Sequence, residues 1–128
     1  MNEIIKYWVD LSDYDFDTAL AMQQSGRYLY VGFMCHQTIE KILKAYFNLI
    51  SNEPAPYTHS LSYLAKKANI YDSFTDDFKN FIDILEPLNI EARYPSHKER
   101  LLKSLTKERC ESILQNTRNI QVWIKEKL

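Results

Sequence analysis

The chain has 128 residues, 45% of them hydrophobic, and a formal net charge of -1. That length suits one compact core, so we expect a single domain over residues 1–128. Charges of mixed sign create no large field that would favour a polynucleotide or an anionic membrane as partner, but they leave room for a local basic patch. Two glycines and four prolines beside abundant Leu, Ile, Lys and Glu favour long helices.

The first predicted helix runs from about Glu3 to Gln24, with apolar residues on one face. Asp15 lies on that apolar face, where a carboxylate is unfavourable unless it is paired. We therefore expect it to meet a cation or a backbone donor from a neighbouring element. Gly26 supplies the left-handed conformation that ends a helix, so the next helix should return antiparallel to the first.

The central helix is predicted over residues Arg27 to Ile50 and carries polar residues through an apolar sequence. Residues four apart lie above one another on a helix, so these side chains form one polar strip. Such a strip can be held together by its own hydrogen bonds, or it can hold an anionic ligand. Its members are His36, Gln37, Glu40, Lys41 and Lys44.

Three more helices and a loop are predicted in the second half. Thr58 is a plausible N-cap for a helix from His59 to about Asn69. Another helix follows from about Asp76 to Leu85. Mixed charge and Pro95 within residues 88–100 indicate an ordered loop, and apolar residues at helical spacing predict the last helix from about Thr106 to Lys127.

Cys35 and Cys110 fall at apolar positions of predicted helices, which is typical of buried thiols in a reducing compartment. No cluster of His, Cys, Asp and Glu has metal-site spacing and no glycine-rich phosphate loop occurs, so neither a metal nor another cofactor is expected. No signal peptide and no stretch of the ~20 apolar residues needed to span a membrane is present. We expect a cytoplasmic protein that does not contact the membrane.

Several motifs, taken in this order, resemble the HEPN family, the higher-eukaryote and prokaryote nucleotide-binding domain. Trp8 and Asp15 stand on the first helix, and HQTIEKILKA follows at residues 36–45 of the second. Thr58-His59-Ser60-Leu61 comes after a loop, and Ala92-Arg93-Tyr94-Pro95 precedes the last helix. The resemblance covers nearly the whole chain.

The resemblance implies an all-α, up-and-down bundle of four main helices with a short extra helix, commonly a homodimer. Small members of this kind are often encoded beside a minimal nucleotidyltransferase, as a two-component or toxin-antitoxin-like pair. It also implies that the chain binds nucleotides or RNA. The chain also has more large aromatic residues than a four-helix core needs, so we expect some of them to lie on a surface patch that a partner covers. The candidates are Tyr7, Tyr14, Tyr28, Tyr46 and Trp123.

The chain departs from the HEPN ribonucleases at their motif, in which four to six residues separate an Arg from a His. Only three residues, Pro95 among them, separate Arg93 from His97, and eight separate Arg27 from His36. RNA cleavage without a metal needs an acid, a base and a cation within reach of the scissile phosphate. A metal-independent endoribonuclease toxin with Arg93 and either His97 or His36 in these roles is therefore the alternative, not the first hypothesis.

Two interpretations of the polar strip remain open. In the structural one, Glu40 pairs with Lys41 or Lys44 at the helix surface, and Gln37 bonds a neighbouring helix. Arg93 would then pair with Asp15 or Glu40 and anchor its loop. A ligand-free dimeric scaffold would satisfy this interpretation.

In the functional interpretation, the loop carries Arg93 and Tyr94 to the strip. Arg93 would hold a phosphate with two parallel hydrogen bonds, while Tyr94 stacks on the ligand or hydrogen-bonds to it. Lys41 and Lys44 would add positive charge.

Overall fold

Residues 2–128 are described by the computed structural model, apart from the side chains of Glu91 and of residues 95–98. Every regular element in that range is helical, which confirms the predicted all-α bundle. The elements are α1 (Glu3–Gln24), α2 (Tyr28–Ile50), α3 (Leu61–Lys67), the 3-10 helix η1 (Tyr71–Ser73), α4 (Asp76–Leu85), α5 (Leu88–Glu91), α6 (Pro95–Ser104) and α7 (Lys107–Lys125).

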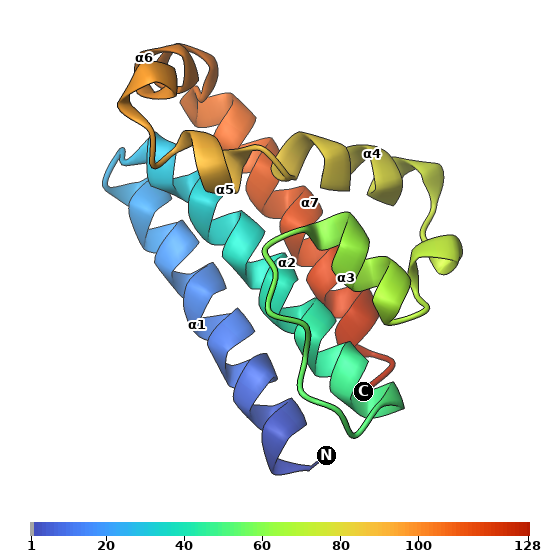
Figure 1. Cartoon of the computed structure of the whole chain (residues 1–128). Helices are drawn as coiled ribbons and strands as arrows, with labels where there is room; N and C mark the ends of the chain where they lie inside the picture. The colour runs from blue at the N-terminus through green and yellow to red at the C-terminus, as the bar shows by residue number, and fades with distance from the viewer. Residues whose placement is uncertain (1) are drawn as a thin grey trace.

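Helix α1 begins and ends where the sequence predicted. The side-chain oxygen of Asn2 accepts a hydrogen bond from the Ile5 N–H at 2.9 Å, which satisfies one free donor of the first turn. Gly26, with φ +75°, takes the left-handed conformation that reverses the chain. Helix α2 therefore returns antiparallel to α1 (Figure 1).

Helix α2 is the centre of the bundle and contacts every other α-helix. Its apolar residues are buried on several sides, and Ile39, Ile42 and Leu43 are fully enclosed. A helix that is surrounded in this way places even its polar residues inside the protein.

The segment 51–60 runs back along α2 before α3 begins (Figure 1). The N-cap of α3 is Ser60, whose hydroxyl accepts from the Tyr63 N–H, so the prediction of Thr58 as the cap is wrong. The Glu86 carboxylate accepts from the N–H groups of Leu61 and Ser62 and fixes the start of the helix there. Thr58 instead accepts from the Ser60 N–H within the preceding turn.

The predicted loop over residues 88–100 is wrong, because most of it forms α5 and α6. Pro95 is the first residue of α6, where a missing N–H has no intrahelical partner to lose. Leu88 and Leu101 are buried and anchor these helices to the core. The proline therefore starts a helix here.

Helix α7 closes the bundle, and the Thr106 hydroxyl caps its first turn by accepting from the Arg109 N–H. Both chain ends lie at one end of the bundle, with α6 at the other (Figure 1). Cys35 and Cys110 are free and buried, and burial raises the pKa of Cys35 to about 12. None of the helices in residues 2–128 has the length and hydrophobicity of a membrane span.

Candidate functional site

Three members of the polar strip are enclosed by the protein. His36 is 0% exposed, Glu40 2% and Lys44 8%. The expected pair of Glu40 and Lys44 is present, but its expected position at the helix surface is wrong. A buried charge needs a close partner, since removing it from water costs several kcal/mol on an order-of-magnitude scale.

Glu40 finds its partners on two elements. Its Oε1 lies 2.8 Å from His59 Nδ1, and its Oε2 lies 3.3 Å from Lys44 Nζ. It pairs with neither Lys41 nor Arg93, which had been its other expected partners. The Lys44 ammonium also lies 5.3 Å from the centroid of the Trp8 ring, so α1 covers this buried cluster.

His36 lies beside the cluster without a hydrogen-bond partner among the described residues for either ring nitrogen. Its Nδ1 is 4.0 Å from Glu40 Oε1. Burial lowers the pKa of His36 to about 4, and the Glu40 carboxylate only partly opposes that effect. The ring is therefore neutral near pH 7, and its full burial keeps it from reaching a substrate as an acid or base.

A second line of polar side chains crosses from α1 to α5. Lys41 donates to Asp15 Oδ2 at 2.7 Å and to Gln37 Oε1 at 3.0 Å. Gln37 donates to Asn89 Oδ1 at 2.9 Å, and that oxygen also accepts from Arg93 Nη2 at 2.9 Å. The expected cation for Asp15 is thus Lys41.

Arg93 pairs with Asn89, so the expected pairing with Asp15 or Glu40 is wrong. It also donates from Nε to the Asn89 carbonyl at 3.1 Å, and its guanidinium lies 5.5 Å from the centroid of the Phe33 ring. Sequence reasoning missed Asn89 because its segment was taken for a loop. Had the segment been predicted as a helix, the four-residue spacing of Asn89 and Arg93 would have indicated that their side chains are neighbours.

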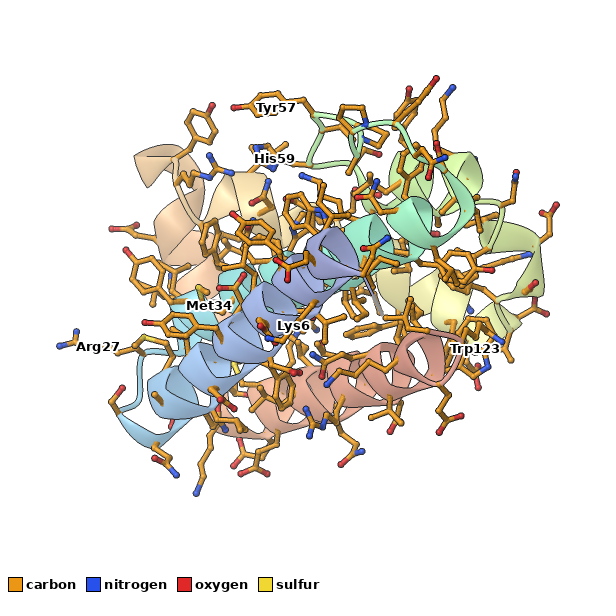
Figure 2. All side chains as sticks on the ribbon, turned by 90° about the horizontal axis from the view of Figure 1, so that it is seen from below. Lys6, Arg27, Met34, Tyr57, His59 and Trp123 are labelled. Atoms are coloured by element: carbon orange, nitrogen blue, oxygen red, sulfur yellow. The ribbon has the colours of Figure 1, made fainter. Side chains whose placement is uncertain are left out.

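Arg93 and Tyr94 are the accessible members of the predicted site. Tyr94 is 55% exposed and precedes the first residue of α6. The structure joins Arg93 to Gln37 and Lys41 through Asn89, but it places His36, Glu40 and Lys44 in the other cluster. Figure 2 shows His59 and Tyr57 on the segment that follows α2, where His59 reaches Glu40. The side chain of His97 lies outside the described residues.

A basic segment begins at Arg93. Residues 93–109 contain six Lys and Arg residues but only Glu99 and Glu108 as acids. The near-zero charge of the whole chain concealed this patch, because α1 alone carries five acidic residues against one lysine. Excess positive charge next to exposed Arg93 and Tyr94 suits an anionic ligand.

No group of three His, Cys, Asp or Glu within the described part of the chain is placed to hold a metal ion. The arrangement at Arg93 can instead offer a planar cation, an aromatic ring and long-range positive charge. These groups can bind a phosphate and a base.

Comparisons with known proteins agree with this architecture. The family model for the HEPN domain matches residues 5–127. The crystal structure of TT1696 from Thermus thermophilus is similar, with a TM-score of 0.86 at 19% identity over 99% of this chain and 100% of that one. No curated protein matches the chain. At 19% identity, the likeness to TT1696 shows the fold alone.

Proposed function

Because this chain belongs to the HEPN domain family, we propose that it binds a nucleotide or RNA at Arg93 and Tyr94 and does not cut it. Family membership supports a nucleotide- or RNA-related helical module, and the position of Arg93 carries the finer proposal. The Arg93 guanidinium is oriented by two hydrogen bonds to Asn89 and by the ring of Phe33. Arg93 is exposed at the start of the basic segment. A cation oriented before binding loses less entropy when a phosphate arrives.

Binding in this proposal rests mainly on Arg93 and Tyr94. Lys41 and Lys44 already contact Asp15 and Glu40, so an anion would have to compete with a carboxylate for each ammonium group. Lys41 stays in the proposed site as a positive charge joined to Arg93 through Gln37 and Asn89, whereas Lys44 lies in the other cluster. Gln37 orients Asn89, while His36 and Glu40 hold the packing that supports the site.

Binding without cleavage is favoured over the ribonuclease alternative by two observations. His36 is enclosed and neutral near pH 7, so it suits neither proton transfer nor phosphate contact. Arg93 and His97 have the wrong spacing for the ribonuclease motif. The family resemblance further leads us to propose a homodimer that works with a minimal nucleotidyltransferase in a toxin-antitoxin-like pair.

The binding proposal is tested by Arg93→Lys, which keeps the charge but removes the planar fork. We expect it to weaken binding of a short single-stranded RNA by about tenfold, or roughly 1.4 kcal/mol. Arg118→Lys is the matched control, because Arg118 also lies over an aromatic ring, Phe16, and donates to an amide, Gln121. Calorimetric titration of RNA and free nucleotides should show the loss only for Arg93→Lys. Equal affinities for the two variants would contradict the proposal.

Cleavage is tested separately by incubating the purified protein with a mixed-sequence RNA in the presence of a chelator. We expect intact RNA, and no change in His97→Ala. Cutting that disappears in both His97→Ala and Arg93→Ala would establish the endoribonuclease alternative. Co-expression with any nucleotidyltransferase that a neighbouring gene encodes, followed by co-purification, tests the proposed pair.

A further inference from the structure

A recess of about 210 Å³ lies where the α1–α2 turn meets α6. Its lining consists of residues Gly26 to Tyr30 and Leu102. The volume is smaller than the ~300–1,000 Å³ typical of sites for drug-sized ligands, so it suits one ring system. Large apolar side chains remain accessible there, since Tyr30 is 44% exposed and Leu102 51% exposed.

Arg27 gives this apolar recess a charged edge. Its side chain is exposed and makes no hydrogen bond or ion pair with the described residues. In Figure 2 it extends away from the body of the protein. An unpaired guanidinium next to an exposed aromatic ring offers a contact for a phosphate beside a face for a base.

The recess lies one turn of α2 from the site at Arg93. Tyr30 and Phe33 are three residues apart on α2 and are therefore neighbours on its surface. Phe33 lies under the Arg93 guanidinium, so one turn of α2 separates the two aromatic residues that these sites use. Leu102, on the α6 side of the recess, belongs to the basic segment 93–109. A strand of nucleic acid that contacts Arg93 would thus pass beside the recess.

We propose that the recess binds a nucleobase carrying a phosphate, with the base stacked on Tyr30 and the phosphate on Arg27. The inference rests on the proposed function, because it extends the binding surface that begins at Arg93. A single-stranded RNA and a free nucleotide share this chemistry. Stacking on an aromatic ring tolerates any base, so little sequence preference is expected.

The test uses a labelled six-residue RNA and fluorescence anisotropy at fixed salt. Tyr30→Ala should weaken binding about fivefold to a hundredfold, the range found when a stacking aromatic is removed, while Tyr30→Phe should retain most of the affinity. Tyr63→Ala is the matched control, because Tyr63 is 46% exposed on α3 and does not line the recess. Arg27→Gln should reduce the slope of log affinity against log salt by about 0.7, as expected for one lost phosphate contact on a single strand.

Parallel titrations with AMP and with inorganic phosphate show whether the ligand of the recess is a nucleic acid, a free nucleotide or phosphate alone. If the protein binds RNA but not AMP, the recess is a nucleic-acid site. If Tyr30→Ala weakens AMP binding as much as it weakens RNA binding, the recess is a site for a free nucleotide. Binding of phosphate alone with the affinity of AMP would overturn the proposal. Thermal melts should show similar melting temperatures for Tyr30→Ala and Tyr63→Ala, since the two rings are similarly exposed.

The outcomes separate this inference from the proposed function. RNA binding that depends on Arg93 but is unchanged in Tyr30→Ala and Arg27→Gln would overturn the inference alone. Binding that depends on Tyr30 and Arg27 but not on Arg93 would support the recess and contradict the site proposed at Arg93. Absence of RNA and AMP binding at millimolar concentration would overturn both.

Discussion

At the scale of a single residue, the environment of His36 is unusual, because buried polar groups nearly always have a hydrogen-bond partner. The ring is fully buried, and neither nitrogen has a partner of normal hydrogen-bond geometry among the described residues. Burial lowers its pKa most strongly; the Glu40 carboxylate acts in the opposite direction, and His59 and Lys41 contribute smaller effects. The native protein therefore holds this imidazole in its neutral form over most of the pH range.

The consequence is a specific loss of stability in acid. The pKa of His36 is about 4 in the folded protein, whereas an unfolded histidine has a pKa of about 6.5. The unfolded chain therefore binds more protons between these values, and the free energy of unfolding falls by about 3 kcal/mol as the pH drops from 6.5 to 4.

Urea unfolding at several pH values, compared between the wild type and His36→Gln, measures this contribution. The variant should show a shallower loss of stability between pH 6.5 and 4, because it lacks the titrating ring. Carboxylates that titrate in this pH range lower the free energy of unfolding equally in the wild type and in His36→Gln, so they do not affect the comparison. Parallel curves for the two proteins would contradict the pKa assigned to His36.

Residue spacing predicted part of the site. It aligned His36, Glu40 and Lys44 on one line of α2, and it required a cation or a backbone donor for Asp15. It did not predict that the line is buried, because the covering groups Trp8 and His59 come from distant parts of the chain. Burial by distant segments is a tertiary property that helical periodicity does not encode.

At the scale of elements, α5 is held to α2 by a close contact. A Cβ atom added to Gly32 would lie 2.8 Å from Leu88 Cδ1, inside normal contact distance. Leu88 is itself buried, and Asn89 follows it in α5 and orients Arg93. The glycine therefore sets how closely α5, and with it the proposed site, approaches the central helix.

Gly32→Val should lower the free energy of unfolding by about 1–3 kcal/mol through overpacking. It should also weaken RNA binding, because α5 and Arg93 are displaced together. Gly32→Ala should be milder, since Ala is favoured over Gly in a helix by about 1 kcal/mol and the end of Leu88 can rotate away. Urea unfolding and RNA titration check both results. Unchanged RNA affinity in Gly32→Val would show that α5 does not position Arg93.

Elements with uninterrupted apolar periodicity were predicted well, as α1 and α7 illustrate. The segment 88–100 was not, because its helices are short and Pro95 was taken as a sign of a loop. A four-residue helix such as α5 has almost no periodicity of its own, and packing of Leu88 against Gly32 holds it in place. Short helices of this kind depend on tertiary contacts more than on propensity.

At the scale of the whole molecule, the outer face of α1 is apolar and uncovered. Ile4 is 53% exposed, Tyr7 56% and Tyr14 70%, and half-buried Leu11 lies between them. The spacing 4, 7, 11, 14 is the heptad pattern by which one helix packs on another. Of the aromatic residues predicted for a covered patch, Tyr7 and Tyr14 are exposed, while Tyr28, Tyr46 and Trp123 instead pack against the core.

We expect this face of α1 to hold the proposed homodimer together, so that the wild type sediments as twice 15.2 kDa at micromolar concentration. Tyr7→Glu combined with Tyr14→Glu would bring like charges together in the seam and should weaken association by about a hundredfold or more. Tyr57→Glu is the control, because Tyr57 is fully exposed on the segment between α2 and α3. A wild-type protein that stays monomeric, or a double variant that still dimerises, would contradict this assignment. If the wild type is monomeric alone, adding a candidate minimal nucleotidyltransferase tests whether such a protein covers the face, since the same double variant should then lose that complex.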